Sequence, residues 1–250
     1  MPIPAAQPSS GARTVLITGA ARRIGRAIAL DMAASGWSVA IHYRRSKAEA
    51  DALANQIAKA GGTACALAAD LADCNALDDL VSRCTRELGA PRCLINNASE
   101  FHLDSVQTLD QATWDTHLDI NLKAPVFLAQ AVARNLPDGV DGNIINIIDQ
   151  RVWKLTPDFF SYTISKAGLW TATRTLAQGL APRIRVNAIG PGPVLRSVHQ
   201  TDAGFAAEQR STLLHTGPSP EEIAAAVRFI LATPSMTGQM IALDGGQHLT

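Results

Sequence analysis

Two side chains four positions apart could carry out proton transfer together. Tyr162 and Lys166 would lie on one face of a helix, about one turn apart. A free phenol has a pKa of about 10, and a nearby ammonium favours the phenolate, so the pair predicts proton exchange near neutral pH. The chain has only two tyrosines, Tyr43 and Tyr162. The same spacing also occurs on exposed helices without a chemical role, so the neighbouring motifs must decide.

A carboxyl group adds to this chemistry. Asp149 follows the isoleucine-rich segment 143–148, NIINII, and precedes Tyr162 by 13 residues. Burial raises the pKa of a carboxyl group, which can then donate a proton, and a carboxylate can bind an amino-substituted heterocycle.

A phosphate-binding turn is predicted where residues 18–25 read TGAARRIG, directly after an apolar run. Gly19 and Gly25 frame the start of a helix, and Arg23 and Ile24 lie between them. Backbone N–H groups at a helix start attract phosphate, and glycine lets the backbone approach a pyrophosphate closely. Many helices also start after glycine for structural reasons, so this turn alone is weak evidence.

A basic turn follows the second apolar run. It reads Tyr43-Arg44-Arg45-Ser46, at the point where an NAD enzyme would carry an acid for the ribose 2′-hydroxyl. Two guanidinium groups and a hydroxyl suit a 2′-phosphate, so the turn predicts NADP(H) rather than NAD(H). A solvated basic turn without a ligand is the alternative.

Alternating strands and helices must position these groups, a pattern typical of βαβ units on a parallel sheet. The predicted strands are 14–18, 38–43, 64–69, 93–95, 142–148, 184–188 and 240–243. The predicted helices are 24–35, 47–60, 77–88, 109–135, 161–179 and one from residue 220, with a bend at Pro125. Such sheets bind ligands outside the carboxyl ends of their strands, where the motifs above lie.

The composition excludes several other classes of protein. The length suits one α/β domain, predicted over 13–250 after a flexible tail over 1–12. Lys plus Arg and Asp plus Glu number 22 each, so neither a nucleic-acid surface nor a polybasic membrane patch is expected. The four cysteines form no C-x-x-C pair, no residue group has metal-ligand spacing, and no apolar run reaches about 18 residues. We expect a cytoplasmic protein that acts on a small molecule.

These motifs together resemble the short-chain dehydrogenase/reductase family. Residues 18–25 are similar to its T-G-x-x-x-G-x-G loop, with Arg23 in place of the middle glycine. Residues 96–99, Asn-Asn-Ala-Ser, are similar to its N-N-A-G segment, although they also fit an ordinary turn. The resemblance implies a single-domain Rossmann fold, a doubly wound parallel sheet of about seven strands flanked by helices. It implies that Tyr162, Lys166 and Asn121 are catalytic, whereas a lone helical Asn also fits packing.

The resemblance also implies a set of contacts to NADPH or NADP+. Asp70 and Leu71 follow the third predicted strand, where the family contacts adenine, although an Asp there also fits a helix cap. The expected cofactor-binding residues are Gly19, Arg23, Ile24, Gly25, Tyr43, Arg44, Arg45, Ser46, Asp70, Leu71, Asn97, Ala98, Ser99, Pro191 and Gly192.

Within the family, the resemblance is greatest to the pteridine reductases and dihydromonapterin reductases, over residues 13 to 248. Most family members carry Ser at the position of Asp149, and this subfamily carries Asp. Its aromatic at the position of Phe101 stacks on the pterin, which a flat ring would do, although a core phenylalanine fits too. Phe101, Asp149 and Tyr162 are therefore the expected substrate-binding residues.

Three functions remain open at this point. The first is reduction of a C=N bond in dihydropterin or dihydrofolate, with Asp149 among the catalytic residues. The second is a carbonyl reductase or alcohol dehydrogenase with an unrelated substrate, in which Asp149 only orients Tyr162. The third is a non-catalytic NADP(H) sensor, against which the intact Tyr162, Lys166 and Asn121 argue.

Two further expectations concern the surroundings of the site. Residues 195–215 should form a substrate lid. The resemblance implies a homo-oligomer, a tetramer or a dimer, built on the helix around residues 114–128 and the helix that carries Tyr162, with Trp170 in the interface.

Overall fold

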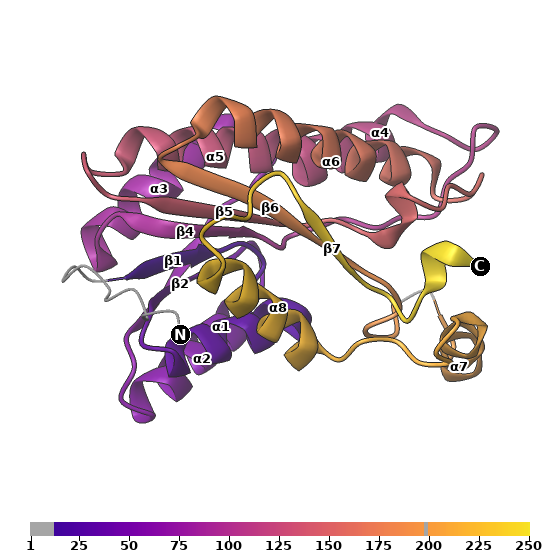
Figure 1. Ribbon diagram of the computed structural model, residues 1–250, viewed down its shortest axis with the longest axis horizontal. Helices are drawn as coiled ribbons and strands as arrows, with labels where there is room; N and C mark the ends of the chain where they lie inside the picture. The colour runs from indigo at the N-terminus through magenta and orange to yellow at the C-terminus, as the bar shows by residue number, and fades with distance from the viewer. Residues whose placement is uncertain (1–12, 198–199) are drawn as a thin grey trace, which may run out of the picture.

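The computed structural model describes residues 13–197 and 200–250. Residues 1–12, predicted as a tail, lie outside the described part. The chain forms three layers, a parallel sheet with helices on both faces (Figure 1). The described residues form a sheet of seven strands in the order β3-β2-β1-β4-β5-β6-β7. Their bounds are Thr14–Ile17 (β1), Ser38–Tyr43 (β2), Ala64–Ala68 (β3), Pro91–Asn96 (β4), Gly142–Ile147 (β5), Ile184–Pro191 (β6) and Met240–Leu243 (β7). The predicted single-domain, doubly wound α/β fold is confirmed.

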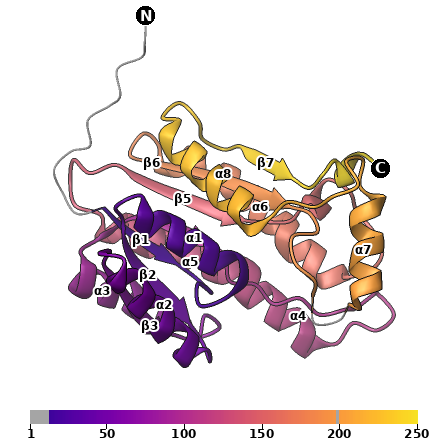
Figure 2. The ribbon, with the colours of Figure 1, turned by 90° about the horizontal axis from the view of Figure 1, so that it is seen from below.

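Helices cover both faces of the sheet, as seen from two sides (Figures 1 and 2). One face carries α1 (Arg23–Ala34), α2 (Lys47–Lys59) and α8 (Pro220–Ala232). The other carries α3 (Cys74–Leu88), α4 (Gln111–Leu118), α5 (Ala124–Asn135) and α6 (Phe160–Leu180). Two large apolar clusters, one for each face, fill the space between helices and sheet. Burial on both faces explains why the strands read as continuous apolar runs.

The predicted helix 109–135 is not continuous. Asp110 caps its first turn by accepting from the Thr113 backbone N–H. A π-helical turn over Asp119–Lys123 then separates α4 from α5, with Ala124 N–H bonded to Asp119 O. Pro125 follows directly and has no N–H to bond the carbonyl four residues earlier. The irregularity thus lies just before the proline, and it contains Asn121.

Other boundaries also differ from the predictions. Helix α3 begins earlier than residue 77, because the Asp73 side chain accepts from Asn75 N–H and caps it. Strand β6 continues to Pro191, because Gly190 and Pro191 still pair with Ala242 and Leu243 of β7.

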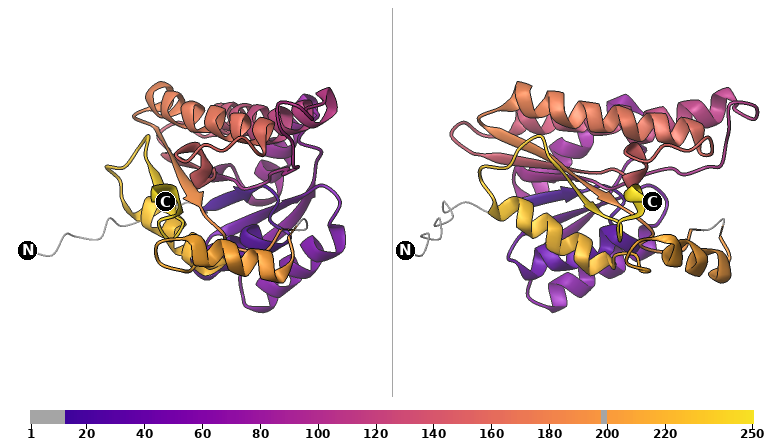
Figure 3. Two further views of the ribbon diagram at one scale, coloured as in Figure 1. Left: turned by 90° about the vertical axis from the view of Figure 1, so that its right-hand side faces the viewer. Right: turned by 45° about the vertical axis from the view of Figure 1, so that its right-hand side comes forward.

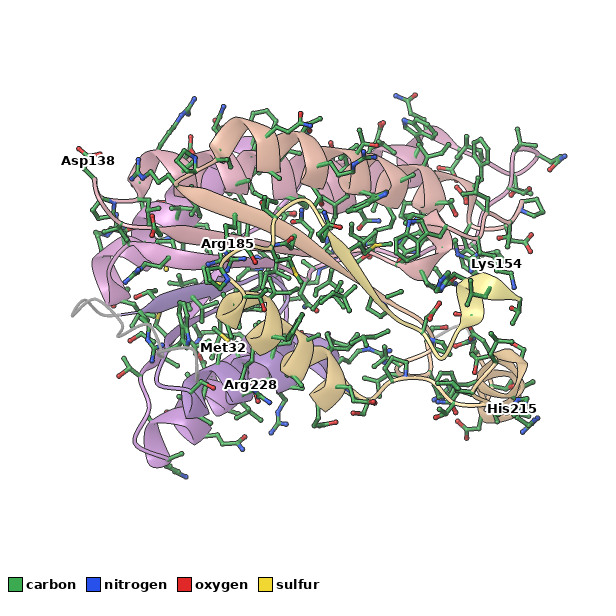
Figure 4. All side chains as sticks on the ribbon, in the orientation of Figure 1. Met32, Asp138, Lys154, Arg185, His215 and Arg228 are labelled. Carbon is green, nitrogen blue, oxygen red and sulfur yellow. The ribbon has the colours of Figure 1, made fainter. Side chains whose placement is uncertain are left out.

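The carboxyl ends of the strands meet at one end of the molecule. Within the expected lid, Asp202–Ser211 forms helix α7, which the sequence patterns did not predict. This helix lies at that end of the sheet, beside the C terminus (Figure 3). Lys154 and His215 lie at the same end, and Asp138 lies at the opposite one (Figure 4). No helix among the described residues is long and apolar enough to cross a bilayer.

Candidate active site

Tyr162, Asp149 and Lys166 converge beyond the end of β5. The Tyr162 phenol donates a hydrogen bond to Asp149 Oδ2 at 2.9 Å. The Lys166 ammonium donates to Ile147 O, the last residue of β5, at 3.0 Å, and lies 5.7 Å from the Tyr162 ring centroid. Tyr162 and Lys166 are 6% and 2% exposed, so both heads are withdrawn from water. Asp149 Oδ1 accepts from Arg151 N–H at 2.8 Å, which fixes the carboxylate.

The electrostatics of this group differ from the expectation for Tyr162. Desolvation, followed by the charge of Asp149, raises the pKa of Tyr162 well above its usual value. Desolvation also raises the pKa of Asp149 and lowers that of Lys166 to about 8. The expectation that Lys166 brings the pKa of Tyr162 toward neutral is therefore wrong for this arrangement, because burial of the phenol and the Asp149 carboxylate outweigh the ammonium. Tyr162 is a protonated donor here.

Asn121 joins the site to the loop after β4. Its Oδ1 accepts from Glu100 N–H at 2.9 Å and from Ser99 Oγ at 3.1 Å. Its Nδ2 donates to Glu100 O at 3.0 Å and to Ser165 Oγ at 3.1 Å. The side chain is fully buried. The π turn thus aims Asn121 at the loop and at the helix that carries Tyr162.

The glycine turn packs tightly against the segment after β4. Asn97 Nδ2 donates to the carbonyls of Thr18 and Gly19 at 2.9 and 3.1 Å, and Thr18 Oγ1 accepts from Asn97 N–H and Ala98 N–H. Gly19 has φ +62°, and a Cβ on Gly25 would lie 2.6 Å from Asn97 Nδ2. A side chain at either position would disrupt this contact.

Arg23 occupies the position of the family's middle glycine. Its φ of 55° lies in the left-handed region that glycine favours. Its guanidinium donates to Leu195 O and Arg196 O, each at 3.0 Å, so the glycine turn holds the start of the expected lid. Ile24 follows in the first turn of α1, where the N-cap residue Arg22 makes no side-chain capping bond.

The basic turn lies at the end of β2, with Arg44 and Arg45 both exposed. Arg44 pairs with Glu100 at 2.8 Å. Tyr43 is partly buried, and its carbonyl accepts from Ala69 N–H. Ser46 precedes α2 and makes no capping bond.

The two expected cofactor contacts after β3, Asp70 and Leu71, differ in their exposure. Asp70 is exposed, and its Oδ1 accepts from Ala72 N–H at 3.0 Å in a turn. Leu71 is 4% exposed and packs with Leu67 and Leu77 in the core. The structure therefore does not bring the Leu71 side chain to the open edge of the sheet.

At the end of β6, Pro191 and Gly192 are held against β7. Gly192 N–H donates to Leu243 O at 2.9 Å, and a Cβ on Gly192 would lie 2.7 Å from Asp244 Cα. The pairing with β7 explains why the Gly-Pro segment is strand rather than loop.

Phe101 contributes to an aromatic group beside Tyr162. Its ring stacks on Phe159, with centroids 4.3 Å apart and planes 9° apart, and meets Tyr162 edge-on at 4.7 Å. The Arg151 guanidinium lies 5.1 Å from the Phe159 ring. Phe159 has φ 57°, a strained conformation for a bulky residue, and the sequence patterns did not single it out.

A buried polar chain behind Tyr162 was also not predicted. His117 Nε2 accepts from His102 N–H at 3.0 Å, and His117 Nδ1 lies 2.6 Å from Ser161 Oγ. Ser161 in turn bonds the Asp104 carboxylate through its hydroxyl and its backbone N–H. This chain ties the loop that carries Phe101 to the first turn of α6.

His42 links the glycine turn to the residue that follows β3. Its Nδ1 accepts from Gly19 N–H at 3.1 Å, so Nε2 carries the proton and donates to Ala69 O at 3.2 Å. Desolvation lowers the pKa of His42 to about 4. The side chain therefore stays neutral, and no sequence motif indicated this role.

The residues at this edge fit a phosphorylated dinucleotide. An uncapped helix start follows the glycine turn, and a helix start attracts anions. Arg44 and Arg45 offer exposed guanidinium groups one strand away. Among the described residues, no three His, Cys, Asp or Glu side chains gather in a way that could hold a metal ion.

Comparison with protein families gives a match over nearly the whole chain. A family model described as enoyl-(acyl carrier protein) reductase matches residues 19–248. The 3-oxoacyl-[acyl-carrier-protein] reductase of Synechocystis is 32% identical over 239 residues, which cover 94% of this chain and 96% of the relative. The chain belongs to the short-chain dehydrogenase/reductase family. It is an oxidoreductase of this family.

Solved structures agree with this assignment. FolM alternative dihydrofolate reductase 1 from Brucella suis, in complex with NADP, shares 52% identity and a TM-score of 0.93. The match covers 95% of this chain and 96% of that one. A short-chain dehydrogenase/reductase from Serratia marcescens shares 30% identity and a TM-score of 0.89, covering 94% of this chain and 98% of the other. The predicted resemblance to the pterin- and folate-reducing subfamily is thus confirmed.

Proposed function

We propose that this chain is an NADPH-dependent reductase of a C=N bond in a dihydropterin or dihydrofolate. The observation that carries the proposal is the hydrogen bond between Tyr162 and Asp149, where most of the family places a serine. The 52% identity to a FolM alternative dihydrofolate reductase solved with NADP supports it.

The cofactor, when bound, supplies the hydride that attacks the ring carbon of the C=N bond. The glycine turn with Gly19, Arg23, Ile24 and Gly25 would hold the pyrophosphate, and Tyr43, Arg44, Arg45 and Ser46 the 2′-phosphate end. The remaining expected contacts are Asp70, Leu71, Asn97, Ala98, Ser99, Pro191 and Gly192, of which Leu71 could contribute only through its backbone.

Tyr162 and Asp149 would supply the proton to the ring nitrogen. The phenol keeps its proton, because desolvation and the neighbouring carboxylate raise its pKa. Donation from Tyr162 to nitrogen leaves a phenolate, which the Lys166 ammonium stabilises. Asp149, when protonated, returns a proton across the 2.9 Å hydrogen bond. Asn121 holds the loop with Ser99 and Glu100 against this group.

Phe101 would provide the flat surface for the substrate ring. Its position edge-on to Tyr162 brings that surface next to the proposed proton donor. Phe159 supports the Phe101 ring from one side, so a planar substrate would use the other side.

Reduction of a carbonyl group is the second candidate. It is favoured by the 32% identity to a 3-oxoacyl-[acyl-carrier-protein] reductase over 94% of this chain. In that case Tyr162 protonates a carbonyl oxygen and Asp149 only orients the phenol.

A homo-oligomer in the cytoplasm remains a further expectation. Phe127 of α5 is 44% exposed, and Trp170 of α6 is partly buried. Apolar side chains on these two helices would suit contacts with a second copy, as the family resemblance implies.

Isotope transfer tests the proposed reaction. Dihydrobiopterin would be incubated with the protein and NADPH carrying two deuterium atoms at C4 of the nicotinamide. We expect a tetrahydropterin that is one mass unit heavier than the product from ordinary NADPH. A product without deuterium, or no reduced pterin at all, would refute the proposal.

A further inference from the structure

One ion pair joins two loops on either side of β1. Arg44 Nη2 lies 2.8 Å from Glu100 Oε1. Arg44 follows β2 and Glu100 follows β4, and β1 is the strand between them in the sheet. The pair therefore spans the carboxyl end of β1, where the glycine turn begins.

Glu100 is fixed in this position by its backbone. Asn121 Oδ1 accepts from Glu100 N–H at 2.9 Å, and Asn121 Nδ2 donates to Glu100 O at 3.0 Å. The side chain is 24% exposed, and its second oxygen lies 3.4 Å from His102 Nε2. The carboxylate is thus a positioned charge rather than a freely moving surface group.

Arg44 is also one of the two guanidinium groups proposed for the cofactor 2′-phosphate. A dianionic phosphate and a carboxylate compete for the same cation, and they repel each other when both lie near it. Glu100 therefore lowers the positive potential of the basic turn at the place where the phosphate would bind. A dinucleotide without a 2′-phosphate does not encounter this competition.

We propose that Glu100 is a specificity-determining residue that restrains the affinity for the 2′-phosphate by holding Arg44 in an ion pair. The inference rests on the proposed role of Arg44. When the phosphate binds, Arg44 exchanges its carboxylate partner for phosphate oxygens. Glu100 thereby limits how strongly the site prefers NADPH to NADH.

Direct binding of NADPH and NADH, measured by fluorescence titration of the purified protein, tests the inference. Glu100→Gln keeps the size and removes the charge, so we expect NADPH to bind about two- to fivefold more tightly, with a smaller change for NADH. Glu100→Ala should act in the same direction. Asp138→Asn, an equal charge change at the opposite end of the molecule (Figure 4), should leave the ratio of the two affinities unchanged. Unchanged or weaker NADPH binding in both Glu100 variants, or equal gains for both cofactors, would overturn it.

A second pair of variants separates this inference from the proposed cofactor site. Arg44→Gln should weaken NADPH more than NADH, and Glu100→Gln should then have a smaller effect in the Arg44→Gln background. If Arg44→Gln leaves NADPH binding unchanged, the proposed role of Arg44 fails and the inference with it. If Arg44→Gln weakens NADPH but neither Glu100 variant tightens it, the inference alone fails.

Discussion

The Tyr162 phenol donates a hydrogen bond of 2.9 Å to Asp149, and the Lys166 ammonium lies 5.7 Å from the centroid of the same ring. A proton can therefore pass between Tyr162 and Asp149, beside the Lys166 ammonium that donates to the last residue of β5. With a serine in place of Asp149, the phenol would have no neighbouring carboxylate. The arrangement suits proton donation to a nitrogen atom better than formation of a resident phenolate.

Removal of the phenol oxygen should stop the reaction without loss of the cofactor. For Tyr162→Phe we expect turnover to fall by about 10²- to 10⁴-fold, the usual contribution of a general acid. NADPH affinity, followed by fluorescence titration, should stay within about twofold, because the phenol is not among the expected cofactor contacts. Turnover close to that of the unmodified protein would rule out Tyr162 as the donor.

Replacement of the carboxyl group should change the choice of substrate. Asp149→Ser restores the residue of most family members, so dihydropterin reduction should lose much more kcat/KM than reduction of a simple ketone. Asp149→Asn serves as the control of equal size, which keeps a hydrogen-bond partner for Tyr162 without an acidic proton. A ketone activity that suffers more than the pterin activity would point to carbonyl reduction.

Removal of the Arg45 guanidinium should weaken the binding of NADPH more than that of NADH. Arg45→Ala removes a guanidinium from the basic turn, so NADPH should bind much more weakly while NADH changes little. Lys59→Ala, a charge change at the far end of α2, is the matched control. An equal loss of affinity for both dinucleotides would show that Arg45 does not bind the 2′-phosphate.

His42 should make the fold sensitive to mild acid. Its pKa falls from 6.5 in the unfolded chain to about 4 in the folded one, because burial disfavours its charged form. Between these pH values the unfolded state binds the additional proton, so stability is lost as pH falls from about 6.5 to about 4. Relative to His42→Gln, the unmodified protein should lose on the order of 3 kcal/mol of unfolding free energy over this range. Urea unfolding measures the free energy of unfolding of both proteins across this range. The same difference between them at every pH would contradict this.

Lys166 should give a dependence of the same sign, in a higher pH range. Burial lowers its pKa from 10.5 to about 8, so folding is disfavoured by a desolvated ammonium below about pH 8. Between about pH 8 and 10.5 the folded protein loses this proton first, and stability should rise relative to Lys166→Met. Urea unfolding at pH 7 and pH 9.5 measures the difference. If the difference in unfolding free energy between the two proteins is the same at both pH values, the ammonium is not desolvated as described.

The sequence predicted the order of the strands and of every long helix except α7, and it located the main motifs. The strands that begin at Thr14 and Ser38 are continuous apolar runs that end in polar turns, and such runs determine strand positions well. The Tyr-x-x-x-Lys spacing placed Tyr162 and Lys166 on one helix face, since helical geometry is local.

The features that the sequence did not predict depend on contacts between distant segments. The pair Arg44–Glu100 joins residues that follow different strands, so only the sheet order brings them together. The π turn at Asn121 and the left-handed backbone at Phe159 have no local signal, because both are conformations that tertiary packing imposes. The pKa of Tyr162 was predicted in the wrong direction, because the spacing indicated Lys166 but showed neither the burial of the phenol nor its contact with Asp149.

The proposed reaction is the reduction of a pterin-type substrate with NADPH. Loss of NADPH absorbance, recorded with dihydrobiopterin, dihydromonapterin, dihydrofolate and simple ketones at equal concentration, distinguishes this reaction from carbonyl reduction. We expect turnover with at least one of the three pterin-type substrates, at a kcat/KM well above that of any ketone. Turnover with a ketone and none with the pterin-type compounds would contradict it.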